Sequence, residues 1–256
     1  MGRKAEEDES GKPGTADAAG FQPTWRAILP ERQDRKTAKI RTAADPADLE
    51  RLAAFAAGLG AGGGVAIPAR QIVTSEVMRM KCRIPTCLGY GSSFSCPPHA
   101  ADAAHMQAVI REYEWALLVG VPLPDDPSPS YEAIFDYMNR MKEIVGRTEV
   151  EAQYAGYVNA MGFTGGPCGL CGVFSPAWMK ARKAGTRVIA CPVLARELPF
   201  CAHYHHCRPA ARAVGIDIYA TARAVGWEDR LSPPPPVRAG RIDWPCLAGV
   251  YPILIV

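Results

Sequence analysis

Cysteines are the residues of this sequence whose number and spacing could do chemistry. Nine are present, and three lie in the stretch KCRIPTCLGYGSSFSCPPHA, where Cys82, Cys87 and Cys96 have the spacing C-x4-C-x8-C. A second group begins with Cys168 and Cys171, spaced C-x2-C, and continues further along the chain. Thiolates are soft ligands that select zinc, copper(I) or iron–sulfur clusters. The cysteines therefore indicate metal chemistry.

The spacing of the first group favours an iron–sulfur cluster over zinc. Structural zinc sites usually combine C-x2-C knuckles or regularly spaced cysteine and histidine pairs, and this stretch has neither. Proline follows Cys96 directly, as it follows cysteine in ferredoxin-type cluster loops. We expect iron–sulfur clusters of the [4Fe–4S] type. Zinc, or thiols that are simply buried or redox-active, are the alternatives.

Two clusters with four thiolates each would need eight cysteines. The second group supplies a complete set of cofactor ligands, namely Cys168, Cys171, Cys201 and Cys207. The first group supplies three, and the candidates for its fourth ligand are Cys191, Cys246, His99 and an exchangeable small molecule. We expect Cys191 to be a metal ligand and lean towards it for this place. Cys246 suits a small, buried hydrophobic residue.

Three histidines and an arginine lie among the expected ligands of the second group. His203, His205 and His206 could donate hydrogen bonds to cluster sulfurs, carry protons or complete a zinc site. They could also belong to a polar loop without such a role. Arg208 could compensate the charge of a cluster or pair with a carboxylate such as Asp217.

The elements that must position these ligands follow from the hydrophobic pattern. Residues 46–57 predict a helix, with Asp45 as its cap and Pro46 in its first turn. The β-branched segment 70–80 predicts a strand that leads to Cys82. The remaining pattern predicts a helix after Pro98, strands at 115–123, before Cys168 and at 250–256, and helices at 131–145 and within 215–227.

These elements predict an α+β fold, with a small mixed β-sheet, packed helices and two cysteine-rich metal-binding loops. Residues 1–45 are expected to form a disordered or extended N-terminal segment, because they are largely polar and lack hydrophobic periodicity. Residues 46–256 are expected to form a single metal-binding domain.

Composition disfavours several classes of function. The net charge of +3 is too small for a protein that binds nucleic acid over its whole surface. The uncharged run from Ala53 to Ala69 is shorter than the roughly 20 apolar residues of a membrane-spanning helix, and the N-terminus has no apolar core of a signal peptide. We expect a cytoplasmic protein that contacts neither membrane nor nucleic acid. That reducing compartment disfavours a disulfide framework.

The order of these motifs resembles the DUF2284 family of predicted metal-binding proteins, over roughly residues 70–256. The family's C-x-x-C…Y-G…C-P-P is similar to Cys82, Cys87, Tyr90, Gly91, Cys96, Pro97 and Pro98, with a wider first gap here. Its G-x-C-x-x-C is similar to Gly166, Cys168 and Cys171, and its C-R-x-P…G-I-D to Cys207, Arg208 and Gly215–Asp217. The chain departs from the family where residues 173–200 separate Cys171 from Cys201. The resemblance implies metal binding and no established reaction.

The sequence favours a ferredoxin-like function, in which the protein transfers electrons to a redox partner protein or carries clusters as an accessory protein. One alternative is an enzyme or maturation factor whose three-cysteine cluster binds a small-molecule substrate at an open iron. Another is a structural zinc module for protein interaction. No Ser-His-Asp order, phosphate loop or pair of carboxylates indicates a separate catalytic site.

Overall fold

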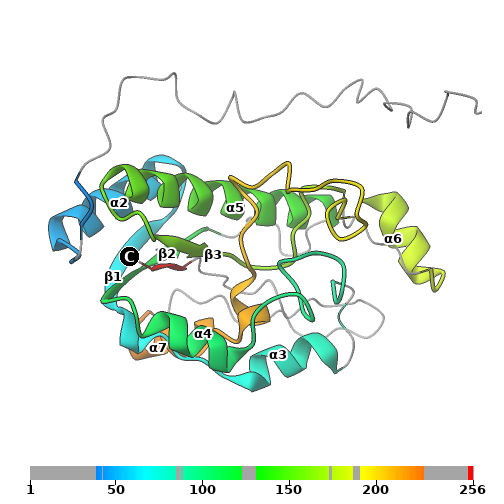
Figure 1. Ribbon diagram of the computed structural model, residues 1–256, viewed down its shortest axis with the longest axis horizontal. Coiled ribbons are helices and arrows are strands. Elements are labelled where there is room, and N and C mark those ends of the chain that lie inside the picture. The colour runs from blue at the N-terminus through cyan, green and yellow to red at the C-terminus, as the bar shows by residue number, and fades with distance from the viewer. Residues whose placement is uncertain are drawn as a thin grey trace, which may run out of the picture.

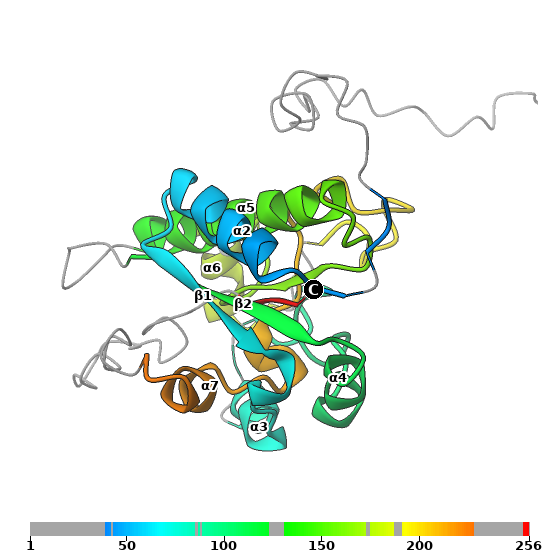
Figure 2. The ribbon, with the colours of Figure 1, turned by 90° about the vertical axis from the view of Figure 1, so that its left-hand side faces the viewer.

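The computed structural model describes residues 39–41, 43–84, 87, 89–122, 131–172, 175–186, 191–227 and 253–255. These residues form three layers, with a sheet between two layers of helices (Figure 1, Figure 2). The predicted α+β class is confirmed. The N-terminal stretch 1–38, and Cys246 with the polyproline stretch before it, lie outside the described residues.

The sheet has four described strands, which are β1 (Gly63–Pro68), β2 (Trp115–Gly120), β3 (Met161–Phe163) and β4 (Ile253–Ile255). Their spatial order is β1-β2-β4-β3, and all three pairings are antiparallel. The sheet is thus antiparallel where a mixed sheet was expected. β4 pairs with both β2 and β3, so the end of the chain closes the centre of the sheet.

Helices cover both faces of the sheet. One face is covered by α2 (Pro46–Gly58) and α5 (Tyr131–Tyr154), and the other by α3 (Glu76–Arg83), α4 (Ala103–Ile110) and α7 (Ile218–Ala224) (Figure 1). The helix α6 (Pro176–Lys183) lies at one end of the molecule, and the short 3-10 turns η1 (Ala69–Gln71) and η2 (Ala211–Val214) link other elements. The site described below lies between the two helical layers.

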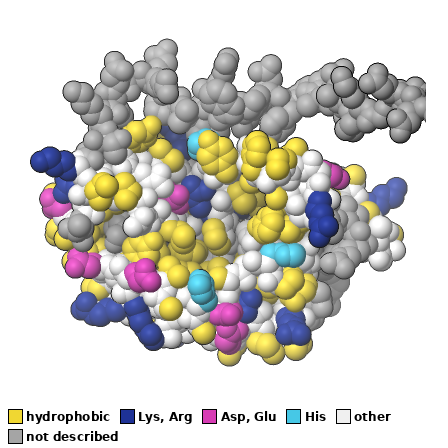
Figure 3. Space-filling view, in the orientation of Figure 1, with side chains coloured by type: hydrophobic (Ala, Val, Ile, Leu, Met, Phe, Trp, Pro, Cys, Tyr) yellow, Lys and Arg dark blue, Asp and Glu magenta, His cyan; other side chains and the backbone are white. Residues whose placement is uncertain are grey.

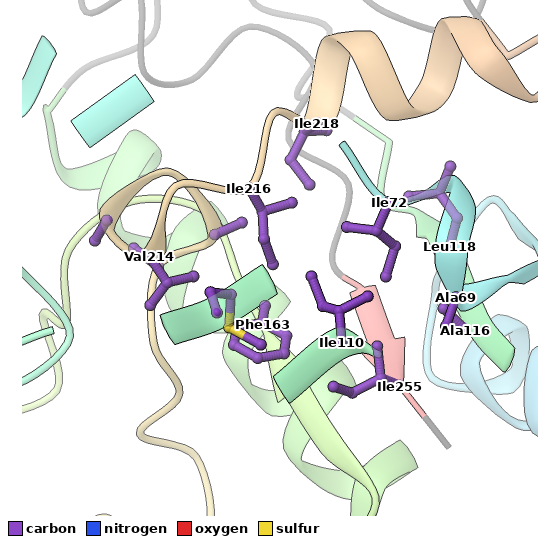
Figure 4. Close-up of a cluster of buried hydrophobic side chains, with 14 of the residues drawn as sticks. Ala69, Ile72, Ile110, Ala116, Leu118, Phe163, Val214, Ile216, Ile218 and Ile255 are labelled. Carbon is purple, nitrogen blue, oxygen red and sulfur yellow. The ribbon is translucent and has the colours of Figure 1, made fainter. Parts of the chain in front are cut away.

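The central strand β2 shows why the sheet is buried on both sides. Successive side chains of a strand point to opposite faces. Ala116 and Leu118 pack in the cluster with α4 and α7, whereas Leu117 and Val119 pack in the cluster with α2 and α5. A strand buried on both faces must be apolar almost throughout, which explains the run WALLVG. Figure 4 shows the first cluster, with Ile72, Ile110, Phe163 and Ile216 grouped near its centre and Leu118 at one side with Ala69 and Ala116.

Most predicted elements are confirmed. The helix after Asp45 begins at Pro46, and the side chain of Asp45 accepts a hydrogen bond from the N–H of Ala47 at 2.9 Å. The strands at 115–123, before Cys168 and at the end of the chain correspond to β2, β3 and β4, and the helix within 215–227 is α7. The helix predicted at 131–145 is longer than expected and ends at Tyr154.

The predicted strand over 70–80 is wrong. Within this segment Thr74 makes one β-bridge, to Ile216, and the chain then turns into α3. Ser75 caps that helix, since its hydroxyl accepts a hydrogen bond from the N–H of Val77 at 3.2 Å, and Glu76 lies in the first turn. This cap outweighs the β-branched residues before it. Cys82 therefore lies in a helix, not in a loop after a strand.

No helix among the described residues combines the length and the apolar character needed to cross a bilayer.

Candidate metal centre

The first cysteine group lies where α3 ends and a tight loop begins. Cys82 is in the last turn of α3, and the N–H of Cys87 donates to the carbonyl of Cys82 at 3.0 Å. The loop then folds back, since the N–H of Gly91 donates to the carbonyl of Pro97 at 2.8 Å. Cys96 is held inside this loop with 7% of its surface exposed.

Cys82, Cys87 and Cys96 line one cavity of about 70 Å³. Its other walls come from distant segments, mainly 164–167 and 210–213, and most of the lining is apolar. One enclosed water occupies about 10–15 Å³ on this measure, so the cavity has room for roughly five waters. The three thiols of the first group therefore share one space that could admit a metal centre.

Burial favours the protonated form of two thiols of this group in the metal-free protein. It raises the pKa of Cys96 to about 12, and hydrogen bonds with the hydroxyls of Ser93 and Ser95 offset only part of the shift. Burial also raises the pKa of Cys82, with a further rise from the charge of Cys87. Metal binding must displace these protons, so the affinity for metal should rise with pH.

Three thiols of the second group lie close together. Cys207 has a single S–H proton that can go to Cys168 or to Cys201, and hydrogen bonding to it lowers the pKa of Cys168 to about 7 and that of Cys201 to about 6. The same interactions raise the pKa of Cys207. Burial, followed by the charges of Cys168, Cys201 and Cys191, raises the pKa of Cys171 to about 12. Cys191 is therefore near enough for its charge to act on Cys171, and it is not among the residues that line the cavity of the first group.

The loop that carries Cys201 and Cys207 packs on α5. A Cβ on Gly146 would collide with the carbonyl oxygen of His205, so a glycine is needed where the loop meets the helix. Arg208 donates to both oxygens of Glu149 on α5, at 2.6 and 2.7 Å. Of the two roles considered for Arg208, the structure shows pairing with a carboxylate. The partner is Glu149, whereas Asp217 caps α7.

The three histidines of this loop share one electrostatic property. Burial lowers the pKa of His203, His205 and His206, so the imidazoles are uncharged near neutral pH. His206 is buried, and the ring of His205 lies against that of Tyr204 with centroids 3.8 Å apart. A neutral imidazole keeps one N–H donor, which suits hydrogen bonding to sulfur better than charge compensation.

The two cysteine groups lie side by side. Ser95 Oγ, one residue before Cys96, accepts a hydrogen bond from the N–H of Cys168 at 2.9 Å. A Cβ on Gly89 would lie 3.1 Å from Cβ of Pro167 and 3.5 Å from Sγ of Cys96. The loop of the first group and the entry to the second group are therefore in direct contact, and Ser95 connects them.

A buried lysine lies beside both groups. Lys142 on α5 has no exposed surface, and its Nζ donates to the carbonyl of Met138 at 3.2 Å. Among the described residues no carboxylate forms an ion pair with it. Burial lowers the pKa of Lys142, and the charges of Cys168, Cys207 and Cys96 act against that shift. The charges of thiols from the second and the first group therefore reach the Lys142 side chain.

The sequence contained a signal for Lys142 but none for Ser95. Lys142 lies on the apolar stripe of α5 that includes Met138, Met141 and Val145, all of which are buried. A lysine within such a stripe indicates a buried charge, and buried charges require partners. The bond between Ser95 and Cys168 joins residues 73 positions apart, and no local pattern predicts it.

No disulfide joins any of the eight described cysteines. Across the described ranges, no set of three or more Cys, His, Asp or Glu side chains is arranged to hold a single metal ion. His99 is exposed, stacks edge-on against Phe94 with centroids 5.8 Å apart, and is not part of the cavity lining.

An α+β protein with two adjacent groups of cysteines belongs to the class of cysteine-rich, metal-binding proteins. The family model described as "Predicted metal-binding protein (DUF2284)" matches residues 65–241, which is more than half of the chain. The chain therefore belongs to the DUF2284 family, as its motifs indicated. Cys246 lies beyond the matched residues. No curated protein and no solved structure matches the chain, so the assignment rests on the family model.

Proposed function

We propose that the protein holds two iron–sulfur clusters of the [4Fe–4S] type, one at each cysteine group. The proposed ligands are Cys82, Cys87 and Cys96 for the first cluster and Cys168, Cys171, Cys201 and Cys207 for the second, with Cys191 next to the second set. The observation that carries the proposal is Lys142, a fully buried lysine with no carboxylate partner among the described residues, on which the charges of thiols from both groups act. A buried charge without compensation is costly, and two anionic thiolate centres would compensate it.

The chemistry of the donor sets fits clusters of this kind. Both groups offer cysteine sulfurs with no carboxylate among the proposed ligands, and all-thiolate sets suit iron–sulfur clusters. Ser95 and the backbone of the adjoining loops supply donors and acceptors around the sulfurs, which is the environment that adjusts cluster potentials. A zinc site with four cysteine ligands would use the same thiols, and metal analysis separates the two.

The proposed activity is electron transfer, either directly or as a cluster-bearing accessory protein. Iron–sulfur clusters supply one-electron chemistry, and two adjacent centres suit transfer of electrons through the protein. A redox partner protein would need a docking surface near the centres. Seven large hydrophobic side chains are exposed in the cysteine-bearing segments, namely Val77, Met80, Ile84, Phe94, Leu198, Phe200 and Tyr204. Figure 3 shows hydrophobic side chains across the middle of one face of the molecule.

A second candidate function is an enzyme or maturation factor that binds a small molecule at the first cluster. The cavity at Cys82, Cys87 and Cys96 favours it, because its largely apolar walls from segments 164–167 and 210–213 extend beyond the thiols and could hold a small molecule beside the metal centre. A structural zinc module, the third candidate, has no comparable support from the cavity.

Paramagnetic resonance of the reduced, anaerobically purified protein tests the proposal. Two clusters predict signals from two centres. Cys168→Ser should remove one signal and Cys96→Ser should change the other, because each residue belongs to a different group. A protein that contains zinc and gives no signal would support the zinc module instead.

A further inference from the structure

A buried hydroxyl without a partner lies in the wall of the cavity. Thr164 lines the cavity and has no exposed surface, and its Oγ1 has no hydrogen-bond partner among the described residues. Its backbone is fully bonded, since the N–H donates to the carbonyl of Pro209 at 2.9 Å and the carbonyl accepts from the N–H of Ala211 at 2.8 Å. The backbone therefore holds the residue in place while the hydroxyl remains unsatisfied. An unsatisfied buried polar group costs stability and calls for an explanation.

Positive charge lies in the same wall. Arg212 lines the cavity, and its guanidinium acts to lower the pKa of Cys82, against the larger effect of burial. Arg79, the other cation that acts on Cys82, is held by the carbonyls of Ala213 and Ala100 at 2.9 and 3.3 Å. Arg212 is the cationic side chain in the described lining of the cavity, which does not include Arg79.

Apart from Tyr219 and the three cysteines, the rest of the lining is apolar. Ala210, Ala211, Ala213, Ile216 and Ile218 belong to the hydrophobic cluster of Figure 4 as well as to the cavity wall. A wall that is part of the core does not collapse to satisfy the hydroxyl of Thr164. One guanidinium and the hydroxyl-bearing residues Thr164 and Tyr219 on a largely apolar wall suit a small monoanion with a hydrocarbon part. A phosphate would require more donors than these.

We propose that this cavity binds a short-chain carboxylate, with its charge at Arg212 and a hydrogen bond to the Thr164 hydroxyl, beside the metal held by the first cysteine group. The inference deepens the proposed function and rests on it for the metal at the thiols. Neither Cys191 nor His99 is in the lining, so among the described residues no fourth protein ligand lines the cavity. The carboxylate therefore takes the place of the fourth ligand.

The test uses acetate, propionate and lactate as probes, with lactamide as an uncharged control. Two quantities are measured on the full-length, anaerobically purified protein: the shift in unfolding temperature, which needs no cluster, and the paramagnetic signal of the first centre. At least one carboxylate should raise the unfolding temperature and change the signal, and lactamide should do neither. Thr164→Val, which has nearly the same shape, should weaken binding about ten- to hundredfold, whereas Thr164→Ser should retain it.

The stability of Thr164→Val separates a binding residue from a structural one. Because its hydroxyl is unsatisfied, the ligand-free variant should unfold at the same temperature as the unmodified protein or at a higher one. A clearly lower unfolding temperature would mean that the hydroxyl has a structural partner, and the inference would fail.

Other outcomes also overturn the inference. The inference fails if no carboxylate changes either quantity, or if carboxylates bind Thr164→Val as tightly as they bind the unmodified protein. It also fails if Cys246→Ala converts the first centre to an open form, because Cys246 would then be the fourth ligand. If the purified protein contains no iron and no sulfide, the proposed clusters are refuted, but the carboxylate site is not. The shift in unfolding temperature would still decide whether the cavity binds carboxylates.

Discussion

Replacement of Lys142 by methionine should change the metal-free and metal-loaded proteins in opposite directions. In the metal-free protein the ammonium has no exposed surface, one carbonyl partner and no carboxylate partner among the described residues. Cys96 is protonated at neutral pH because its pKa is about 12, so compensation comes mainly from Cys168, whose pKa is about 7. Methionine has a similar shape and removes a buried amine whose charged form is poorly compensated without metal, which is why burial lowers its pKa.

The size of both effects follows from the burial of the charge. Replacing buried ionic groups by hydrophobic residues of similar volume often stabilises a protein by about 1–4 kcal/mol. For a chain of this size each kcal/mol corresponds to about 2–4 °C in unfolding temperature. In the metal-loaded protein the anionic centres lose their cation, and breaking a buried pair costs about 3–5 kcal/mol. Since reduction adds negative charge, the potentials of both centres should fall by on the order of 100 mV, where 59 mV corresponds to a tenfold change.

The assay compares thermal unfolding with and without metal, and redox titration of both centres. Arg140→Met is the matched control, because it removes the same charge from an exposed position on the same helix. It should leave the potentials nearly unchanged. If Lys142→Met fails to stabilise the metal-free protein and leaves both potentials unaltered, Lys142 does not compensate the centres and the reasoning is refuted.

Three further predictions concern the thiols and their loops. The metal-free, reduced protein should lose stability as the pH rises above about 9, because the unfolded chain ionises Cys96 there while the folded chain keeps it protonated up to about pH 12. Cys96 alone should lower the free energy of unfolding by about 1.4 kcal/mol per pH unit in this range. In urea unfolding, Cys96→Ser should therefore lose stability less steeply with pH than the unmodified protein, and equal slopes would contradict this. Removal of metal should reduce amide protection in residues 191–207 more than in α5, because few apolar side chains of that loop are buried; equal protection in hydrogen exchange would argue against it. Cys191→Ala should perturb the second centre and leave the signal of the first intact, since Cys191 lies near Cys171; the opposite pattern would assign Cys191 to the first cluster.

Hydrophobic periodicity correctly predicted the helices and strands that are long enough for a repeating pattern to be recognised. The stripe from Tyr131 onward predicted α5, and WALLVG predicted β2, because both patterns extend over several residues with one consistent period. The segment 70–80 was misassigned because Ile72, Val73 and Thr74 have β propensity, while the decisive signal was a single cap at Ser75. β1 was not predicted because its glycines are typical of a turn after the first helix.

The candidate site was predictable as two groups of cysteines but not as one arrangement. Spacing alone predicted that Cys82, Cys87 and Cys96 meet and that Cys168, Cys201 and Cys207 meet. The contact between the groups depends on tertiary packing, through Ser95 and through the close approach of Met138 on α5 to Gly166. For the same reason no sequence pattern indicated the hydroxyl of Thr164, whose role depends on what surrounds it.

The content of iron, acid-labile sulfide and zinc in anaerobically purified protein decides whether the two cysteine groups hold iron–sulfur clusters. We expect about eight iron and about eight sulfide per chain, with little zinc, because two [4Fe–4S] clusters are proposed. Loss of about half of both in Cys168→Ser would show that the two groups hold separate clusters. Stoichiometric zinc without iron and sulfide would contradict the proposed clusters.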